Sequence, residues 1–274
     1  MKIGIIGQGF VGNAIYQKFS KYYNVLTYDL DESKCNSTQE EIAAVSDVVF
    51  VCLPTPMNQD GSCNIDIVEG VITQLNENYN STVVIKSTIP PGTTDRLNEK
   101  YSNIDIVFNP EFLTEANAVD DFENQTRIVL GGSNKGTTKL KRIYSSIFRK
   151  TSKIIKTDAK TAELVKYVTN CFLSTKVSFA NEIYQLCDGL GLDYDKVIEY
   201  ATYDERLGLS HWGVPGPDGD FGFGGHCFPK DLQAIISITN ELKITNNVLT
   251  ATQQTNNELR NNRDWENMKG RAVV

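Results

Sequence analysis

The sequence predicts an α/β protein, with an N-terminal doubly wound sheet domain followed by a mostly α-helical domain that has a long central helix. First, short apolar runs alternate with amphipathic stretches through the first half, as in βαβ units. Second, these runs are continuous and rich in Val and Ile, as expected for strands buried on both faces. Third, from Asp158 to Leu190 the chain has the pattern of one helix. We therefore expect domains at 1–155 and 156–274.

The expected elements follow the chain in order. The strands are Lys2–Ile6, Val25–Asp29, Val48–Leu53, Thr82–Lys86, Asp105–Asn109 and Arg127–Gly131. Helical patterns between them are Val11–Tyr22, Thr38–Val45, Asp66–Asn76, Thr93–Tyr101 and Lys135–Phe148. After the long helix, which Thr157 or Asp158 could cap, we expect a helix at Tyr194–Ala201, a Gly- and Pro-rich loop from Tyr203 to Phe228, and helices near Pro229–Glu241 and Thr245–Asn262.

Composition excludes several classes of protein. The 274 residues are 40% hydrophobic and 22% charged, an ordinary globular mixture. The net charge of −7 argues against a broad nucleic-acid-binding face, and no apolar run approaches the roughly 18 residues of a membrane span. None of the six cysteines forms a CxxC pair, and no Cys/His cluster has zinc spacing, so we expect no metal. The N-terminus has the pattern of a first strand, not of a signal peptide, so we expect a cytoplasmic protein with reduced thiols.

A glycine-rich turn connects the first strand to the first helix. In Gly7-Gln8-Gly9-Phe10-Val11-Gly12, the first glycine allows a tight turn, the second lets a pyrophosphate approach, and the third lets the helix pack on the sheet. Asp29 ends the second strand, 17 positions after Gly12, where a carboxylate binds ribose hydroxyls and repels a 2′-phosphate. The pattern predicts a Rossmann domain that binds NAD rather than NADP. The alternative is a plain glycine turn followed by a loop aspartate.

Two proline-containing turns follow the third and fourth strands. They are Leu53-Pro54-Thr55-Pro56 and Ser87-Thr88-Ile89-Pro90. Both lie at carboxyl ends of strands, where open α/β sheets bind ligands. Taken singly, each is also explained by ordinary turn chemistry.

Two pairs of polar residues are spaced by four positions. Glu111 and Glu115 follow the fifth strand, and such pairs are commonly an exposed helix face. Lys166 and Asn170 share one face of the long helix, where ammonium and amide could together bind an oxyanion. A surface lysine with its stem packed on the helix is the alternative for Lys166.

The segment Gly222-Phe223-Gly224-Gly225-His226-Cys227-Phe228-Pro229-Lys230-Asp231 is the most informative. A cysteine near a helix N-terminus and a lysine has its thiolate favoured, so Cys227 is a candidate nucleophile. Asp231 lies one helical turn further on, within reach as a general base. The alternative is a flexible loop with an incidental cysteine.

Together these segments resemble the UDP-glucose 6-dehydrogenase/GDP-mannose dehydrogenase family. The motifs that carry the resemblance are GQGFVG, LPTP, STIPPG, NPEFLTEA, ELVKYVTNCFL, ERLG and GFGGHCFPKD, in this order. It extends from residue 1 to beyond Asp231, and the last motif is the most specific.

The resemblance implies a four-electron oxidation of a sugar C6 alcohol to a carboxylate, with two NAD used. In the family, the cysteine matching Cys227 attacks the aldehyde to give a thiohemiacetal, a second hydride transfer gives a thioester, and water hydrolyses it. Lys166 and Asn170 match residues that stabilise oxyanions, and Asp231 matches an acid that acts with an ordered water. Glu111 matches a residue linked to thioester hydrolysis.

The resemblance also implies the remaining site residues. Thr88 matches a water-holding hydroxyl, and Arg206 an arginine that reaches a neighbouring subunit's substrate. The expected cofactor-binding residues are Gly7, Gly9, Phe10, Val11, Gly12, Asp29, Lys34, Pro54, Thr55, Thr88, Glu115 and Lys230. The expected substrate-binding residues are Glu111, Phe112, Leu113, Lys166, Asn170, Arg206, Phe223, Gly224 and Cys227. The implied substrate is a nucleotide sugar, with UDP-glucose favoured and UDP-glucuronate, a polysaccharide precursor, as product.

The sequence departs from the family pattern at four places. The chain ends where a third, nucleotide-gripping domain is expected, so we expect a short form. The loop around Val214–Gly219 is longer, Lys176 stands for the usual arginine, and His226 for a small residue. The longer loop or a partner subunit is expected to replace some contacts of the third domain.

Two alternatives to this function stay open. One is a single-hydride dehydrogenase of the 6-phosphogluconate/β-hydroxyacid type, and the other is a catalytically inactive nucleotide-binding subunit. The resemblance does not select among UDP-glucose, GDP-mannose and N-acetylated sugars. The helix Asp158–Leu190 is the expected seam of a homodimer.

Overall fold

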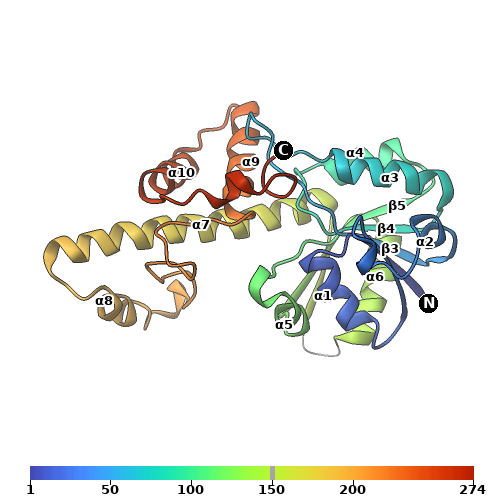
Figure 1. The fold of residues 1–274 in the computed structure, drawn as a ribbon, viewed down its shortest axis with the longest axis horizontal. Coiled ribbons are helices and arrows are strands. Elements are labelled where there is room, and N and C mark those ends of the chain that lie inside the picture. The colour runs from blue at the N-terminus through green and yellow to red at the C-terminus, as the bar shows by residue number, and fades with distance from the viewer. Residues whose placement is uncertain (149–151) are drawn as a thin grey trace. The chain divides into compact units, whose positions relative to one another are not determined.

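A computed structural model describes residues 1–148 and 152–274. Two compact units form within it (Figure 1). The first comprises Met1–Thr55 and Ile65–Lys166, and the second comprises Pro56–Asn64 and Tyr167–Val274. The domain boundary expected near residue 155 stays a prediction.

Seven strands of the described residues form one sheet in the first unit, in the order β2-β1-β3-β4-β5-β6-β7. Their bounds are β1 Lys2–Ile6, β2 Asn24–Tyr28, β3 Val48–Val51, β4 Thr82–Ile85, β5 Asp105–Phe108, β6 Arg127–Gly131 and β7 Lys153–Thr157. Neighbours pair in parallel except β5 and β6, which pair antiparallel through Phe108 and Gly131. The carboxyl ends of β1 to β5 therefore meet at one edge, which places the turns that follow them together.

Helices cover both faces of this sheet (Figure 1). One core cluster joins the strands to α1 (Phe10–Phe19), α5 (Ala118–Glu123) and α6 (Asn134–Ile147). The other joins them to α2 (Gln39–Val45), α3 (Asp66–Asn78) and α4 (Thr93–Lys100). The central strands are buried on both faces because of this double covering, which confirms the doubly wound α/β fold.

The structure differs from the sequence prediction at the far edge of the sheet. β7, in the segment KIIKT, was not among the expected strands, because its residues are half-exposed or exposed and lack a continuous apolar run. The short helix α5 was also not expected. The antiparallel pairing of β6 is a further difference, since an apolar strand pattern carries no information on direction.

The second unit is mostly helical. α7 (Ala159–Leu190) begins in the first unit and continues into the second. It is followed by α8 (Tyr194–Ala201), the short helix η3 (Glu205–Leu207), α9 (Phe228–Glu241), α10 (Asn247–Leu259) and η4 (Asp264–Asn267). Two small core clusters hold this unit together: one around Phe223, Leu232 and Ile236, the other around Ala180 and Tyr194. Among the helices of residues 1–148 and 152–274, none is long and apolar enough to span a bilayer.

Candidate functional site

The turn after β1 has the geometry of a phosphate-binding loop. Gly7 has φ of 93°, a left-handed conformation that favours glycine. A Cβ on Gly12 would collide with the carbonyl oxygen of Gly7, so only glycine lets α1 start this close to the strand. Gly9 is the N-cap of α1 and has open space where a Cβ would lie. The free N–H groups of the helix N-terminus therefore face a region that an anionic group can enter.

Asp29 lies beside this turn, directly after β2. Its Oδ2 accepts a hydrogen bond from the Gln8 N–H at 2.5 Å, and its Oδ1 accepts one from the Asp31 N–H at 2.9 Å. A hollow of about 520 Å³ adjoins them, lined by Gln8, Gly9, Phe10, Asn13, Tyr16, Thr27, Ser33, Lys34, Cys35 and Asn36. Lys34 forms an exposed ion pair with Asp31, 3.2 Å between Nζ and Oδ2. The structure thus brings Gly9, Phe10 and Lys34 to one concave surface.

The turns after β3 and β4 are hydrogen-bonded to each other. Thr55 Oγ1 donates to the carbonyl oxygen of Thr88 at 2.8 Å. The hydroxyl of Ser87 donates to the Leu53 carbonyl at 2.6 Å and accepts from the Leu53 N–H at 3.0 Å. Thr55 and Thr88 are both buried, while Pro54 is exposed. The hydroxyls of Thr55 and Ser87 therefore fix the two turns to each other at the carboxyl edge of the sheet.

Glu111 and Lys166 form a buried ion pair. Lys166 Nζ lies 2.9 Å from Glu111 Oε1, and the side chains are 3% and 7% exposed. Glu111 Oε2 accepts from the Leu113 N–H at 2.6 Å, so both carboxylate oxygens are occupied. Lys166 also lies over the ring of Phe112, 5.7 Å from its centroid, and Arg127 lies over the same ring at 4.1 Å. Lys166 is thus a buried, partnered ammonium, which excludes the alternative of a surface lysine.

Glu163 fixes the first turns of α7, on which Lys166 lies. It is fully buried and accepts from the N–H groups of Gly92 and Thr94, at 2.5 and 2.8 Å. These groups belong to the N-terminus of α4, so a carboxylate there is stabilised by hydrogen bonds and by the helix dipole. Burial nevertheless raises the pKa of Glu163 above its usual value. Sequence reasoning missed this residue, because its partners lie about 70 positions away in the chain.

Lys86, directly after β4, is a second buried ammonium that sequence reasoning missed. Its Nζ donates to Asn109 Oδ1 at 3.1 Å and to the Pro110 carbonyl at 3.4 Å. Burial lowers its pKa to about 8, although the charge of Glu111 acts in the opposite direction. The available signal was a lysine directly after a wholly apolar strand. Lys86 holds the start of the loop that carries Glu111.

In the second unit, Asp231 is the centre of a buried polar cluster. Asn170 Nδ2 donates to its Oδ2 at 2.6 Å, and Lys230 Nζ donates to its Oδ1 at 2.6 Å. Asp231 is 1% exposed, so this carboxylate depends on these partners. Burial alone would lower the pKa of Lys230, but the negative charge of the bonded Asp231 outweighs it and raises that pKa above its usual value.

Cys227 is the N-cap residue of α9 and is half-buried. Its carbonyl accepts the first-turn hydrogen bond from the Asp231 N–H at 3.0 Å, and Pro229 lies in the first turn, where its missing N–H is harmless. Lys230 follows three residues later, in the first turn of α9. Phe223 packs into the core of the second unit, and Gly224 is half-buried in the same loop.

Two expected site residues lie on the surface. The Arg206 side chain is 88% exposed and pairs with Asp204. Glu115 is exposed at the start of the short helix η2 (Glu115–Asn117). Within the described part of the chain, no group of three or more Cys, His, Asp or Glu residues could hold a metal ion.

Comparisons with known proteins match both halves of the chain to one family. The family model for the NAD-binding domain of the UDP-glucose/GDP-mannose dehydrogenase family matches residues 36–151, and the model for its central domain matches residues 160–258. The UDP-glucose 6-dehydrogenase of Rickettsia bellii is 32% identical over 94% of this chain and 67% of its own length. That of Bacillus subtilis is 29% identical over 94% of this chain and 63% of its own.

The chain belongs to the UDP-glucose/GDP-mannose dehydrogenase family. It spans about two thirds of the length of these relatives. A solved UDP-glucose dehydrogenase from Pyrobaculum islandicum superposes with a TM-score of 0.85 at 28% identity, over 94% of this chain and 68% of that one. The chain carries two domains of a family of NAD-dependent nucleotide-sugar dehydrogenases.

NAD is the cofactor of the family's first domain, and the residues present fit it. The tight approach of Gly12 to Gly7 and the open space at Gly9 form a backbone cradle of the kind that a pyrophosphate enters. Asp29 provides a carboxylate where the adenosine ribose of a dinucleotide would bind.

The departures from the family pattern have defined places in the second unit. Lys176 donates to the carbonyls of Leu207 and Gly208, at 2.9 and 3.1 Å, and lies over the ring of Trp212. In the longer loop, Asp218 pairs with Arg260 at 2.6 Å. Both departures thus hold the segment between Arg206 and Cys227 against its own unit.

Proposed function

We propose that this chain oxidises the C6 alcohol of a nucleotide sugar to the carboxylate in two NAD-dependent steps, and that the substrate is UDP-glucose. The observation that carries the proposal is the start of α9, where Cys227 is the N-cap residue and Lys230, three positions later, is bonded to the buried Asp231. A thiol in this setting is suited to covalent capture of an aldehyde. Family membership supports the substrate class.

The chain's residues handle protons and negative oxygen atoms. NAD, when bound, accepts the hydride that leaves the sugar carbon in each of the two oxidations. Asp231 is an anionic acceptor for the proton of the alcohol, taken through an ordered water. Lys166 and Asn170, one turn apart on α7, donate hydrogen bonds to the oxygen as it becomes negative.

Cys227 captures the aldehyde before it is released. A C–S bond forms as the carbonyl oxygen gains a proton, which gives a thiohemiacetal, and the second oxidation leaves a thioester. Water then adds to the thioester carbon and the C–S bond breaks, which frees the carboxylate and the thiol. To Glu111, which Lys166 and the Leu113 N–H hold, we assign the role of assisting the attacking water. The sum is one alcohol and one water converted to a carboxylate, with two hydrides and three protons released.

A homodimer is part of this proposal. α7 exposes a stripe of large apolar side chains in the second unit: Val168, Phe172, Phe179, Leu186 and Leu190. Phe172 is 67% exposed, and a stripe of this kind is typical of a helix with a partner. The exposed Arg206 would then contact the substrate of the partner subunit. The six cysteines, all within the described residues, form no disulfide there, which supports a reducing, cytoplasmic location.

The test is a panel of UDP-glucose, GDP-mannose and N-acetylated UDP-sugars, read by NADH and by carboxylate product. We expect two NADH per carboxylate, with UDP-glucose the best substrate. The Cys227→Ser variant should lose carboxylate formation, while Cys187→Ala, which changes a buried thiol in the core cluster around Ala180 and Tyr194, should keep it. One NADH per product would support the single-hydride alternative, and full activity of Cys227→Ser would refute the mechanism.

A further inference from the structure

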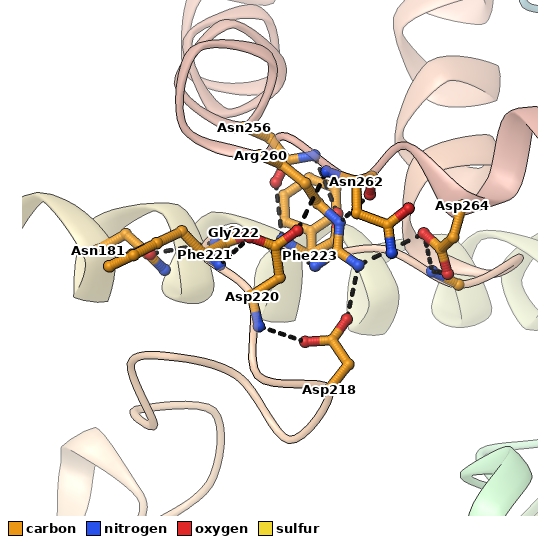
Figure 2. Close-up of polar contacts among 11 residues, drawn as sticks. Asn181, Asp218, Asp220, Phe221, Gly222, Phe223, Asn256, Arg260, Asn262 and Asp264 are labelled. Atoms are coloured by element: carbon orange, nitrogen blue, oxygen red, sulfur yellow. Dashed lines mark hydrogen bonds and ion pairs between the residues drawn. The ribbon is translucent and has the colours of Figure 1, made fainter.

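The glycine-rich segment Gly222–Gly225, just before Cys227, is held by side chains from other elements of the second unit (Figure 2). Asn256 of α10 makes two bonds to one residue: its Oδ1 accepts from the Phe223 N–H at 2.7 Å, and its Nδ2 donates to the Phe223 carbonyl at 3.0 Å. Asn181 of α7 accepts from the Gly222 N–H at 3.1 Å. These bonds fix the orientation of three successive peptide groups.

Arg260, which follows α10, joins the same segment to the longer loop. Its side chain is 1% exposed and lies between two carboxylates, with Nη2 at 2.6 Å from Asp218 and 3.4 Å from Asp264. Its Nε donates to the Asn262 carbonyl at 2.8 Å, and its Nη1 donates to the Phe221 carbonyl at 3.4 Å. A buried guanidinium with this many acceptors is rigidly placed.

Asp264 completes the contact near the cysteine, because it accepts from the Gly225 N–H at 3.0 Å through Oδ2. The glycines allow this close approach. A Cβ on Gly224 would collide with Arg260 and Asp264, and Gly222 has φ of 67°. The segment is therefore packed against this set of polar side chains, and Cys227, the N-cap of α9, follows two residues later.

We propose that Asn256 and Arg260 are positioning residues for Cys227: by fixing Gly222–Gly225 they set where the thiol stands at the start of α9. The inference rests on the proposed function, because the thiol's role as nucleophile comes from there. Neither residue is assigned contact with the substrate. Only the second oxidation needs the bond between sulfur and the aldehyde carbon, so loss of positioning should release aldehyde after one hydride transfer.

Asn256→Ala is the main variant, and its matched control is Asn257→Ala, which changes the exposed neighbour on the same helix. Arg260→Lys keeps the charge but loses the fork of donors, and Arg263→Lys is its exposed control. Hydrogen exchange is measured on the peptide covering 221–227. Aldehyde is trapped with hydroxylamine, and Cys227 alkylation by iodoacetamide is compared with that of Cys35.

For Asn256→Ala we expect exchange of the 221–227 amides to become at least about ten-fold faster, which is the effect of losing one buried hydrogen bond. NADH per sugar should fall from two toward one, with trapped aldehyde making up the difference and the first oxidation slowed less than the second. Alkylation of Cys227, but not of Cys35, should become faster as the half-buried sulfur is released. The Asn257→Ala and Arg263→Lys controls should behave as wild type.

Equal slowing of both oxidations with no aldehyde would overturn the positioning role and leave Asn256 a merely structural residue. Unchanged hydrogen exchange of the 221–227 amides in Asn256→Ala would show that Asn256 does not hold this segment. If the wild-type protein oxidises no nucleotide sugar, the proposed function fails. The positioning of the thiol is still tested in that case, because an unchanged rate of Cys227 alkylation in Asn256→Ala would overturn it. If Asn256→Ala does not fold, the same measurements are made on Arg260→Lys, for which we expect the same results.

Discussion

The first and second units each contain a buried lysine, and the two behave in opposite ways. Lys86 is 3% exposed and Lys230 is 8% exposed. Burial lowers the pKa of Lys86 to about 8, whereas the pKa of Lys230 is raised despite burial. Lys86 donates to two neutral oxygens, while Lys230 is bonded to a carboxylate. Burial therefore determines the lowered pKa of Lys86, whereas at Lys230 the bonded carboxylate of Asp231 outweighs burial.

This difference in charge suits the two regions to different steps of the proposed reaction. Around Glu111 there are two ammonium groups for one carboxylate, which leaves an excess of positive charge suited to an oxyanion. Around Lys230 there is one ammonium for Asp231 and two cysteines, which suits a proton acceptor and a nucleophile. The following predictions alter this balance of charge.

The largest effect is expected from Asp231→Asn, which leaves Lys230 buried with no carboxylate beside it. Breaking a buried ion pair in this way costs about 3–5 kcal/mol of unfolding free energy. The double variant Asp231→Asn/Lys230→Met should recover part of that loss, because no unpartnered charge remains. Urea unfolding of the variants measures both values. Equal stability of the single and double variants would show that the Lys230 charge is not held by Asp231.

Lys166→Met removes the ammonium that contacts Glu111. Loss of one oxyanion donor typically lowers turnover about 10²–10³-fold. Lys160→Met, on an exposed position of the same helix, is the control and should keep wild-type turnover. Steady-state NADH formation measures the turnover of both variants. Equal turnover in the Lys166 and Lys160 variants would remove Lys166 from the mechanism.

Lys86 should make stability depend on pH in the alkaline range. Its pKa is about 8 in the folded protein and 10.5 as the ordinary value, so between these pH values only the unfolded chain keeps the proton. Unfolding free energy should then rise with pH, by about 2 to 3 kcal/mol across the window. Lys86→Met should remove this rise. If the unfolding free energies of Lys86→Met and wild type changed with pH in parallel, the lowered pKa of Lys86 would be contradicted.

The smallest effect is expected at an exposed cluster, where Glu69 pairs with Arg96 at 2.8 Å and Lys100 at 2.7 Å. The hydrogen bonds from these cations lower the pKa of Glu69 to about 2. Glu69→Gln should nevertheless cost at most about 1 kcal/mol, since solvent screens exposed pairs. Thermal unfolding at pH 7 measures the loss. A cost as large as that of Asp231→Asn would mean that burial does not distinguish these pairs.

Much of the first unit could be predicted from the sequence, because its signals are local. The apolar runs gave all of the central strands, and the glycine turn with Asp29 indicated the dinucleotide site. β7 was missed because its pattern, half-exposed and exposed, resembles that of a loop. The partners of Lys166 and Asn170 were also hidden, since Glu111 and Asp231 lie 55 and 61 positions away.

The residues that hold the cysteine segment could not be predicted for a related reason. Asn256 and Arg260 are polar residues at the end of a helix, where an exposed position is the ordinary expectation. Only the fold brings Asn256 to Phe223, 33 positions away, and buries both. Helical periodicity reports which residues share a face, but not which loop packs against that face.

Covalent capture by Cys227 is the central claim, and an acid-quenched reaction tests it directly. Wild-type protein is mixed with UDP-glucose and NAD, quenched within the first turnover, and digested for peptide mass spectrometry. The account predicts a sugar-nucleotide acyl group on the peptide that contains Cys227, absent from Cys227→Ser and from samples without NAD. Two NADH per carboxylate with no adduct on Cys227 at any quench time would contradict it.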